Sequence, residues 1–154
     1  MLTAQKHLKG FTLIELLVVI GILAVLLAIV LIAINPARQF AQANDTQRKS
    51  DVNAILNAID QYAAENRGNL PAPLISGTTY SVAAAGSNPT GAAFCNALVP
   101  TYIAQLPKDP QTGTYTDCST YDTKYTVSVA SGSGTPRVTV SATPQLATTI
   151  SVTR

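Results

Sequence analysis

The chain has 154 residues, of which 12% are charged, and its formal net charge is +2. Both surplus charges come from Lys6 and Lys9, since residues 11–154 hold eight basic and eight acidic side chains. A broad electrostatic surface for nucleic acid needs clustered Lys and Arg, so no specific nucleic-acid partner is expected. About 85 residues lie outside the long helical region described below, which leaves room for one small globular domain.

Histidine is almost absent from the chain. The single copy, His7, lies near the N-terminus, so the rest of the chain has no imidazole for Ser-His or Cys-His catalysis or for a metal site. Acids such as Asp60 and Glu65 are most simply explained as a solvated helix face. We therefore expect a protein that is not an enzyme and has no cofactor.

An apolar run of 24 residues from Phe11 to Ile34 carries one formal charge, Glu15. It is long enough for a helix to cross a bilayer core of about 30 Å. The preceding residues 1–10 are short, polar and basic, which places them in the cytoplasm by the positive-inside rule. A secretory signal peptide does not fit, because its apolar core is about 7–15 residues long and ends at a small-residue cleavage site.

Glu15 distinguishes two further interpretations of this run. A plain single-pass anchor fits the length but leaves the acid unexplained, although a carboxylate at the bilayer midplane costs about 2.5–3.5 kcal/mol. If the chain were cut after Gly10, the new α-amine of Phe11 would be a cation near the height of Glu15. The acid could then face its own helix N-terminus or the amine of a neighbouring chain.

The stretch Lys9–Ala24, KGFTLIELLVVIGILA, resembles the N-terminal signature of type IV pilins and the related pseudopilins. The resemblance implies that a membrane prepilin peptidase cuts between Gly10 and Phe11 and methylates the new N-terminus. It also implies that Glu15 pairs with the Phe11 amine of the next subunit during assembly. The match covers roughly the first 25 to 60 residues, and the remainder shows only family-like organisation.

The resemblance further implies a fold, a location and partners. The expected fold is α+β and pilin-like, with a long N-terminal helix whose membrane half protrudes and whose other half packs on a small antiparallel sheet. The expected precursor crosses the cytoplasmic membrane once with its C-terminus outside and then enters an extracellular filament. Its expected partners are further copies of itself, the prepilin peptidase, the assembly platform and its ATPase machinery, and the membrane.

Asn35-Pro36 follows the apolar run. A proline inside a helix removes one hydrogen bond and kinks or breaks the helix. In the family a proline near this place loosens the anchor helix in the filament, which makes Pro36 and Gly21 candidate melting points. The alternative is that Pro36 simply ends the membrane helix, and the sequence does not choose between the two.

Residues 37–67 have the pattern of an amphipathic helix that continues the first one. An apolar stripe recurs at spacings of three and four: Val52, Ile55, Leu56, Ile59, Tyr62 and Ala63. Polar residues that include Arg48 and Asp51 are expected on the solvent face. Gly68 supplies the stop signal, so a continuous helix from Phe11 to Arg67 would be about 85 Å long.

Residues 69–123 are rich in loops, with a short strand expected over Thr78–Ala84 and a short helix over Gly91–Val99. The phrase LPKDP at residues 106–110 resembles a stretch of the major pseudopilins of type II secretion, in which a calcium-binding loop follows. Three acids are therefore candidate ligands: Asp109, Asp117 and Asp122. Calcium needs six to eight oxygens, so ordinary turn residues are the preferred interpretation and no metal is predicted.

Cys95 and Cys118 are the only cysteines, and both follow the membrane segment. Without histidine or a zinc-ligand spacing, a disulfide is the simplest interpretation. It would stabilise the fold by roughly 3 kcal/mol in the chain-entropy model. Many pilins carry such a bridge near the C-terminus, whereas here 36 residues follow it, so the family's adhesive-loop role is not transferred to residues 95–118.

The C-terminal part of the chain has the alternation of β-structure. Lys124–Ala130 and Arg137–Thr143 alternate apolar and polar residues around a Gly- and Ser-rich turn, which predicts a hairpin. Leu146–Val152 is expected to add an edge strand. The apolar face of this sheet would pack on the stripe of the preceding helix.

Taken together, the patterns predict four segments: a leader at residues 1–10, a membrane or filament-core helix at 11–34, an amphipathic helix at 35–68 and a β-rich head at 69–154. The expected function is that of a structural subunit, a prepilin. One alternative is a pseudopilin of a secretion or DNA-uptake pseudopilus. Another, from a different class, is a membrane-anchored extracellular binding domain that never polymerises.

Overall fold

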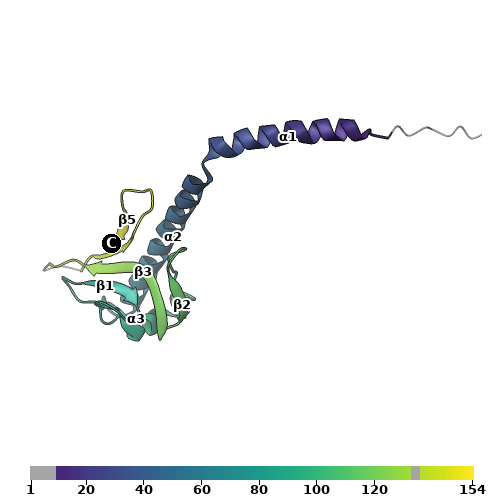
Figure 1. The fold of residues 1–154 in the computed structure, drawn as a ribbon. Helices are drawn as coiled ribbons and strands as arrows, with labels where there is room; N and C mark the ends of the chain where they lie inside the picture. The colour runs from purple at the N-terminus through teal and green to yellow at the C-terminus, as the bar shows by residue number, and fades with distance from the viewer. Residues whose placement is uncertain (1–9, 133–135) are drawn as a thin grey trace, which may run out of the picture. The chain divides into compact units, whose positions relative to one another are not determined.

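The computed structural model describes residues 10–132 and 136–154, so nearly all of the expected leader lies outside the described residues. Within them the chain forms two compact units that divide after Gln39, and we describe each unit by itself. The elements in order are α1 (Leu13–Ile34), α2 (Pro36–Glu65), β1 (Thr79–Ala83), α3 (Gly91–Leu98), β2 (Thr114–Asp117), β3 (Thr120–Val129), β4 (Val138–Ala142) and β5 (Ile150–Thr153) (Figure 1). The fold is α+β, with an apolar N-terminal helix and a five-stranded antiparallel sheet, as predicted.

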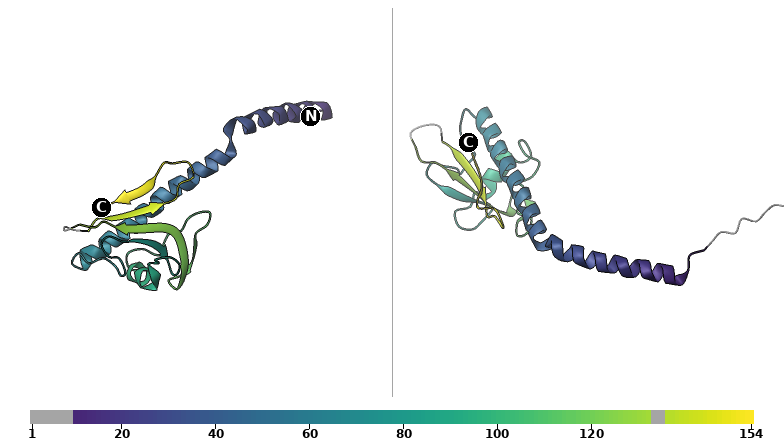
Figure 2. Two further views of the ribbon diagram at one scale, coloured as in Figure 1. Left: turned by 60° about the vertical axis from the view of Figure 1, so that its left-hand side comes forward. Right: turned by 90° about the horizontal axis from the view of Figure 1, so that it is seen from above.

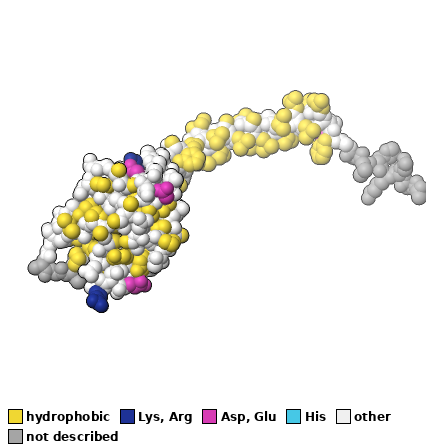
Figure 3. Space-filling model, turned by 90° about the horizontal axis from the view of Figure 1, so that it is seen from below, with side chains coloured by type: hydrophobic (Ala, Val, Ile, Leu, Met, Phe, Trp, Pro, Cys, Tyr) yellow, Lys and Arg dark blue, Asp and Glu magenta, His cyan; other side chains and the backbone are white. Residues whose placement is uncertain are grey.

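Helix α1 is 22 residues long and buries none of its side chains. At 1.5 Å per residue it extends about 33 Å, close to the thickness of a bilayer core. Figure 3 shows apolar side chains along its length, and its hydropathy is high enough for a membrane span. A helix that is apolar all round and unburied in its own chain needs lipid or other helices around it.

The helical region is not continuous, so the single helix from Phe11 to Arg67 is not observed. Of the two alternatives left open for Pro36, the structure has the one in which the first helix ends at this place. α1 ends at Asn35, whose φ of 47° lies in the left-handed region. α2 restarts at Pro36, because proline lacks an N–H and its fixed φ suits the first position of a helix. The Asn35 side-chain Oδ1 accepts the Arg38 N–H at 3.3 Å and so caps the new helix. Gly21 causes no interruption, since α1 runs through it unbroken.

The sheet is built around β3, which is paired along both edges. β1 pairs with one edge, and β4 pairs with the other edge over Tyr125–Val129. β2 pairs with the same edge as β4 but only over Thr120–Asp122. Neither β2 nor β4 pairs with β3 at Thr123 and Lys124, so a gap separates these two strands along the same edge of β3. We call this gap the fork.

The strands agree in part with the sequence patterns. The predicted hairpin is confirmed as β3 and β4, and the predicted short strand and helix are confirmed as β1 and α3. The predicted edge strand is shorter than expected, since β5 begins at Ile150 and pairs with β4. β2 lies in a region expected to be loop, and the Asp117 carboxylate forms its turn to β3 by accepting the N–H groups of Ser119 and Thr120 at 2.8 Å.

The described residues from Phe40 onward form the second unit, which we call the head from here on. Its core lies between α2 and one face of the sheet (Figure 2). Four members of the apolar stripe, Val52, Ile55, Leu56 and Ile59, are fully buried, which confirms the predicted packing. The opposite face is formed by the alternate residues of the strands. Cys95 of α3 is joined to Cys118 of the β2–β3 turn, which confirms the predicted disulfide and ties the short helix to the sheet.

Candidate functional site

The first candidate site is the segment that precedes α1. Gly10 and Phe11 have no regular secondary structure, and the Phe11 side chain is 85% exposed. A Cβ added at Gly10 would meet no atom within 4 Å. A peptide bond outside regular secondary structure can be bound by a protease, whereas a bond inside a helix cannot be reached without unfolding. The Gly10–Phe11 bond lies before α1, outside regular secondary structure.

Glu15 lies four residues further on, in the first turn of α1, and forms a capping box with Thr12. The Thr12 hydroxyl accepts the Glu15 N–H at 3.3 Å, and the Glu15 Oε2 accepts the Thr12 N–H at 2.8 Å and the Thr12 hydroxyl at 2.7 Å. Two N–H groups at the helix start are satisfied in this way. The sequence analysis missed this role, although the spacing T-x-x-E before an apolar run is its signature.

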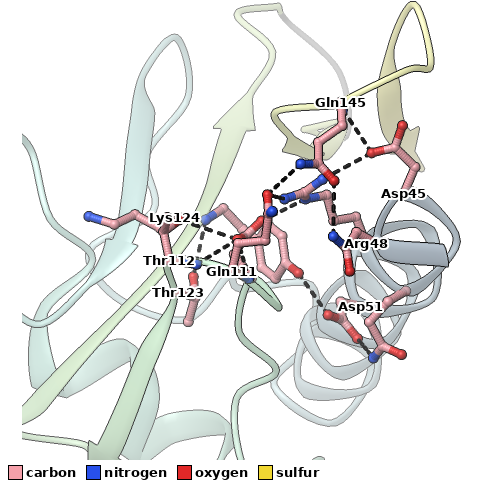
Figure 4. Close-up of polar contacts among 12 residues, drawn as sticks. Asp45, Arg48, Asp51, Gln111, Thr112, Thr123, Lys124 and Gln145 are labelled. Atoms are coloured by element: carbon pink, nitrogen blue, oxygen red, sulfur yellow. Dashed lines mark hydrogen bonds and ion pairs between the residues drawn. The ribbon is translucent and has the colours of Figure 1, made fainter. Parts of the chain in front are cut away.

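A second concentration of polar groups lies beside the fork, where the Asp109 N–H donates to the Thr123 carbonyl at 2.9 Å and Arg48 of α2 binds the Asp109 carboxylate. Arg48 is 3% exposed. Its Nε donates to Asp109 Oδ2 at 2.6 Å, its Nη1 to Asp45 Oδ1 at 3.0 Å and its Nη2 to Gln111 Oε1 at 3.3 Å. Figure 4 shows Arg48 and Asp45 reaching from α2 toward Gln111 and Gln145. We call Asp45, Arg48 and Asp109 the buried ion cluster.

The prediction that Arg48 and Asp51 face solvent is wrong, because both are buried. Positions 45, 48, 52, 55 and 59 follow the same spacing of three and four, so the charged residues extend the apolar stripe toward the start of α2. Asp51 accepts the Tyr125 hydroxyl at 2.7 Å and the Gln47 amide at 2.8 Å. This spacing was the available signal, but the partners of the charges come from distant segments.

Asp45 holds the segment that leads into β5. Its Oδ1 accepts the Gln145 N–H at 2.8 Å, and its Oδ2 accepts the N–H groups of Leu146 and Ala147 at 2.8 and 2.9 Å. Burial opposes the charged form of Asp45, but these hydrogen bonds and Arg48 outweigh it and lower the pKa of Asp45 below its ordinary value. This attachment explains why β5 starts later than the alternation predicted.

Asp109 belongs to the LPKDP phrase and organises the loop that follows. Its Oδ1 accepts the N–H groups of Gln111 and Thr112, both at 2.9 Å. Gly113 lies so close that a Cβ there would come within 2.8 Å of the Asp109 carbonyl oxygen. Burial opposes the charged form of Asp109, but Arg48 and the loop N–H groups lower its pKa from 3.8 to about 2.

The three acids considered as calcium ligands are engaged separately. Asp109 pairs with Arg48, Asp117 accepts backbone N–H groups in the β2–β3 turn, and Asp122 pairs with Lys124. Among residues 10–132 and 136–154, no group of three or more His, Cys, Asp or Glu side chains could hold a metal ion. The guanidinium of Arg48 supplies the positive charge next to the Asp109 loop.

Comparison with known proteins identifies the N-terminal segment. Residues 6–31 match the family model described as the prokaryotic N-terminal methylation motif. This motif is the class III signal peptide of type IV pilins and pseudopilins, so the resemblance found in the sequence is confirmed over these residues. A search of curated proteins gave no significant match, and neither did a search of solved structures. The chain is thus a pilin- or pseudopilin-like precursor by its N-terminal motif.

The buried ion cluster predicts a large effect of removing its cation. Replacing Arg48 by alanine leaves two buried carboxylates without their partner, and breaking a buried ion pair costs about 3–5 kcal/mol. We expect Arg48→Ala to lower the melting temperature of the full chain in detergent far more than Lys49→Ala, since Lys49 is the exposed neighbour on the same helix. Equal melting temperatures for the two variants would contradict the role of the cluster.

Acid should destabilise the head through Asp45 and Asp109. Because the pKa of each carboxyl is lowered in the folded state, each contributes stability above its unfolded pKa of 3.8 and loses it as the pH falls toward its folded pKa. A pKa lowered to about 2 corresponds to about 2 kcal/mol for Asp109. Thermal denaturation between pH 7 and pH 2 measures this loss. Asp109→Asn should be less stable at pH 7 and show a shallower decline below pH 4, and an unchanged decline would argue against the assignment.

Proposed function

We propose that the chain is a prepilin that is cut between Gly10 and Phe11, methylated at Phe11 and assembled into a filament. The observation that carries the proposal is the N-terminal methylation motif at residues 6–31, which includes most of an apolar helix that buries none of its side chains. Pilin-type proteins are structural subunits, which agrees with an assembly role and not with catalysis.

The proposed location follows from the same helix. Before cleavage α1 spans the cytoplasmic membrane once, with residues 1–10 inside and the head outside, as the basic leader favours. After extraction, the apolar surface of α1 is covered by α1 helices of other copies in the core of the filament. The prepilin peptidase, the assembly platform and its ATPase are the proposed partners of this process, and the filament is extracellular.

Glu15 has two proposed tasks in this sequence of events. In the single chain its Oε2 is held by Thr12, while the structure records no hydrogen bond to Oε1 within the described residues. In the filament the carboxylate pairs with the Phe11 amine of the neighbouring subunit and sets the axial register of the helices. An ion pair that is surrounded by apolar helices offsets the cost of burying either charge alone.

Gly21 and Pro36 are proposed to act when subunits pack. Asn35 and Pro36 already interrupt the helix in the single chain. Gly21 lies in open space on α1, and glycine lowers helix stability by about 1 kcal/mol relative to alanine. Local unfolding of α1 at Gly21 in the filament therefore costs less free energy than local unfolding at a residue with a higher helix propensity.

One alternative within the same class is a pseudopilin of a secretion or DNA-uptake system. The LPKDP phrase favours it, since Asp109 organises a loop at the place where the major pseudopilins have their calcium-binding loop. The neutral exterior rich in Ser and Thr favours a long exposed fibre. In an anchored domain that never polymerises, the N-terminal methylation motif would have no function, which disfavours this alternative.

The experiment that tests the proposal is the intact mass and N-terminal sequence of the protein in material sheared from cells. We expect a chain that starts at methylated Phe11 and is recovered as polymer. A processed chain that stays in the envelope would indicate the pseudopilin, and a chain that still starts at Met1 would refute processing. Gly10→Val is the matched control, because a branched side chain before the cut should block cleavage and leave the head folded.

A second experiment separates the two tasks of Glu15. Thr12→Val removes the cap but keeps the carboxylate, whereas Glu15→Val removes both. If Glu15 acts in assembly, Thr12→Val should still form filaments and Glu15→Val should form at least tenfold fewer, although both are processed and inserted in the membrane. Shearing followed by immunoblotting measures filament yield. Equal losses in the two variants would mean that helix capping alone accounts for Glu15.

A further inference from the structure

The two edges of the sheet differ in whether their backbone groups are already bound within the chain. The strand order β1-β3-β4-β5, with β2 off this path, makes β1 and β5 the outer strands (Figure 2). An outer strand presents a row of N–H and C=O groups that another strand can bind. What each edge already binds therefore determines whether it is available to a second chain.

The outer edge of β1 is closed by the segment that follows it. Ser81 forms an isolated bridge with Pro89 there. Its N–H donates to the Asn88 carbonyl at 3.0 Å, and its carbonyl accepts the Thr90 N–H at 2.9 Å. The side-chain amide of Asn88 donates to the Thr79 carbonyl. A strand from another chain would find these groups occupied.

The outer edge of β5 carries groups that are directed away from the sheet. In an antiparallel pair, residues that are hydrogen-bonded to each other alternate with residues that are not. Val138 and Arg154 form a bonded pair, with N–H to carbonyl distances of 2.7 and 3.0 Å, so the register makes Val152 the next bonded residue of β5. The N–H and C=O groups of Ser151 and Thr153 therefore point outward. We call these groups the open edge.

The open edge is accessible and unprotected. Its backbone groups have no hydrogen-bond partner within residues 10–132 and 136–154, and both Ser151 and Thr153 are exposed. Proteins commonly protect an edge with lysine, proline or a β-bulge. The sequence of β5, ISVT, has neither of these residues, and its pairing with β4 shows no shift of register. Only the short length of the strand limits what it can bind.

The end of β5 is held in place, and its charge is neutralised. The Arg154 Nη1 donates to Asn57 Oδ1 at 2.7 Å and to Asp60 Oδ2 at 3.1 Å, both on α2. Because Asp60 pairs with Arg154, two copies of this edge can approach each other without bringing two unpaired cations together. A strand that is already fixed loses little conformational freedom when it pairs.

The open edge is complementary to a second copy of itself. If two β5 strands lie antiparallel with Val152 opposite Val152, Ser151 of each copy faces Thr153 of the other. Every outward N–H can then donate to an outward carbonyl, and since each copy supplies two N–H groups, four hydrogen bonds join the pair. The arrangement has two-fold symmetry, which is the commonest symmetry of protein dimers.

A second copy fits the open edge better than an unrelated peptide does. The N-terminal motif implies assembly from many copies of the chain, so further β5 strands are present at high local concentration. So few hydrogen bonds give only weak association in dilute solution, and pairing becomes significant where copies are held close together. The short open edge therefore suits a partner that is already concentrated beside it.

We propose that β5 is an interface at which two copies of the chain pair through antiparallel strands centred on Val152. A two-fold contact closes on itself, whereas a filament grows through contacts that do not close. The pairing through β5 is therefore separate from the contacts that extend a filament, and it joins copies in pairs. It involves only residues of the head, so it does not require cleavage at Gly10.

Cysteine cross-linking of the full chain in detergent tests this proposal. Val152→Cys places two thiols across the two-fold axis in a pair that is not hydrogen-bonded, where Cα atoms lie about 4.5 Å apart and a disulfide can form. Thr101→Cys is the matched control, since Thr101 is exposed but lies outside β5. After mild oxidation, we expect about fivefold more disulfide-linked dimer from Val152→Cys on a non-reducing gel.

Association through α1 in the micelle would raise the dimer yield of both cysteine variants alike, so equal yields would overturn the proposal. Ser151→Cys tests the register. Residue 151 faces residue 153 of the other copy, so its thiol should cross-link far less than that of Val152→Cys, although Ser151 is the more exposed residue. A higher yield from Ser151→Cys would mean that the strands do not pair around Val152.

Proline at position 151 tests the hydrogen bonds themselves. It removes an outward N–H and none that binds β4. In the Val152→Cys chain, Ser151→Pro should leave the melting temperature unchanged and abolish most of the dimer, whereas Ser151→Ala keeps the N–H and should keep the dimer. An unchanged yield with proline would contradict the proposal. If Ser151→Pro melts lower, Thr153→Pro removes the other outward N–H and repeats the test.

Discussion

The head depends on the guanidinium of Arg48, which binds the Asp109 carboxylate beside the fork of the sheet. β2 and β4 occupy the same edge of β3, and between them the Asp109 N–H donates to the Thr123 carbonyl. Arg48 enters from α2 and binds Asp109 in the loop before β2, while its neighbour Asp45 binds the segment before β5. A buried charge is tolerated only when it is paired and hydrogen-bonded, so helix, loop and last strand have to be in place together.

The two units of the chain differ in whether their apolar side chains are exposed or buried. α1 leaves all its apolar side chains uncovered and satisfies its first N–H groups with Thr12 and Glu15, which suits a medium without water. The head packs its apolar residues against α2 and exposes hydroxyl groups and few charges to water. Asn35 and Pro36 separate α1 from α2, since a residue in left-handed conformation followed by proline ends one helix and starts another.

Local patterns in the sequence predicted what depends on local chemistry. The apolar run, the stripe of α2, the β3–β4 hairpin and the Cys95–Cys118 pair each follow from spacing or composition and are present in the structure. The partners that allow Arg48 and Asp51 to be buried could not be predicted, because they lie 61 and 74 residues away. The sequence left open whether Pro36 ends the first helix, and what it did not predict is the left-handed conformation of Asn35, although asparagine adopts a positive φ more readily than most residues. The alignment of Ser and Thr side chains across β1, β3, β4 and β5 was missed because it exists only once the registers of four strands are known.

The attachment of Asp45 to residues 145–147, a hundred residues further along, sets a condition on folding. Contacts so distant in sequence form slowly, since the chain between them must first be closed into a loop. The head therefore cannot be completed until residues 145–147 have been synthesised. Until then the side chains of Arg48 and Asp45 remain hydrated. Residues 145–147 complete the fold when their N–H groups bind Asp45.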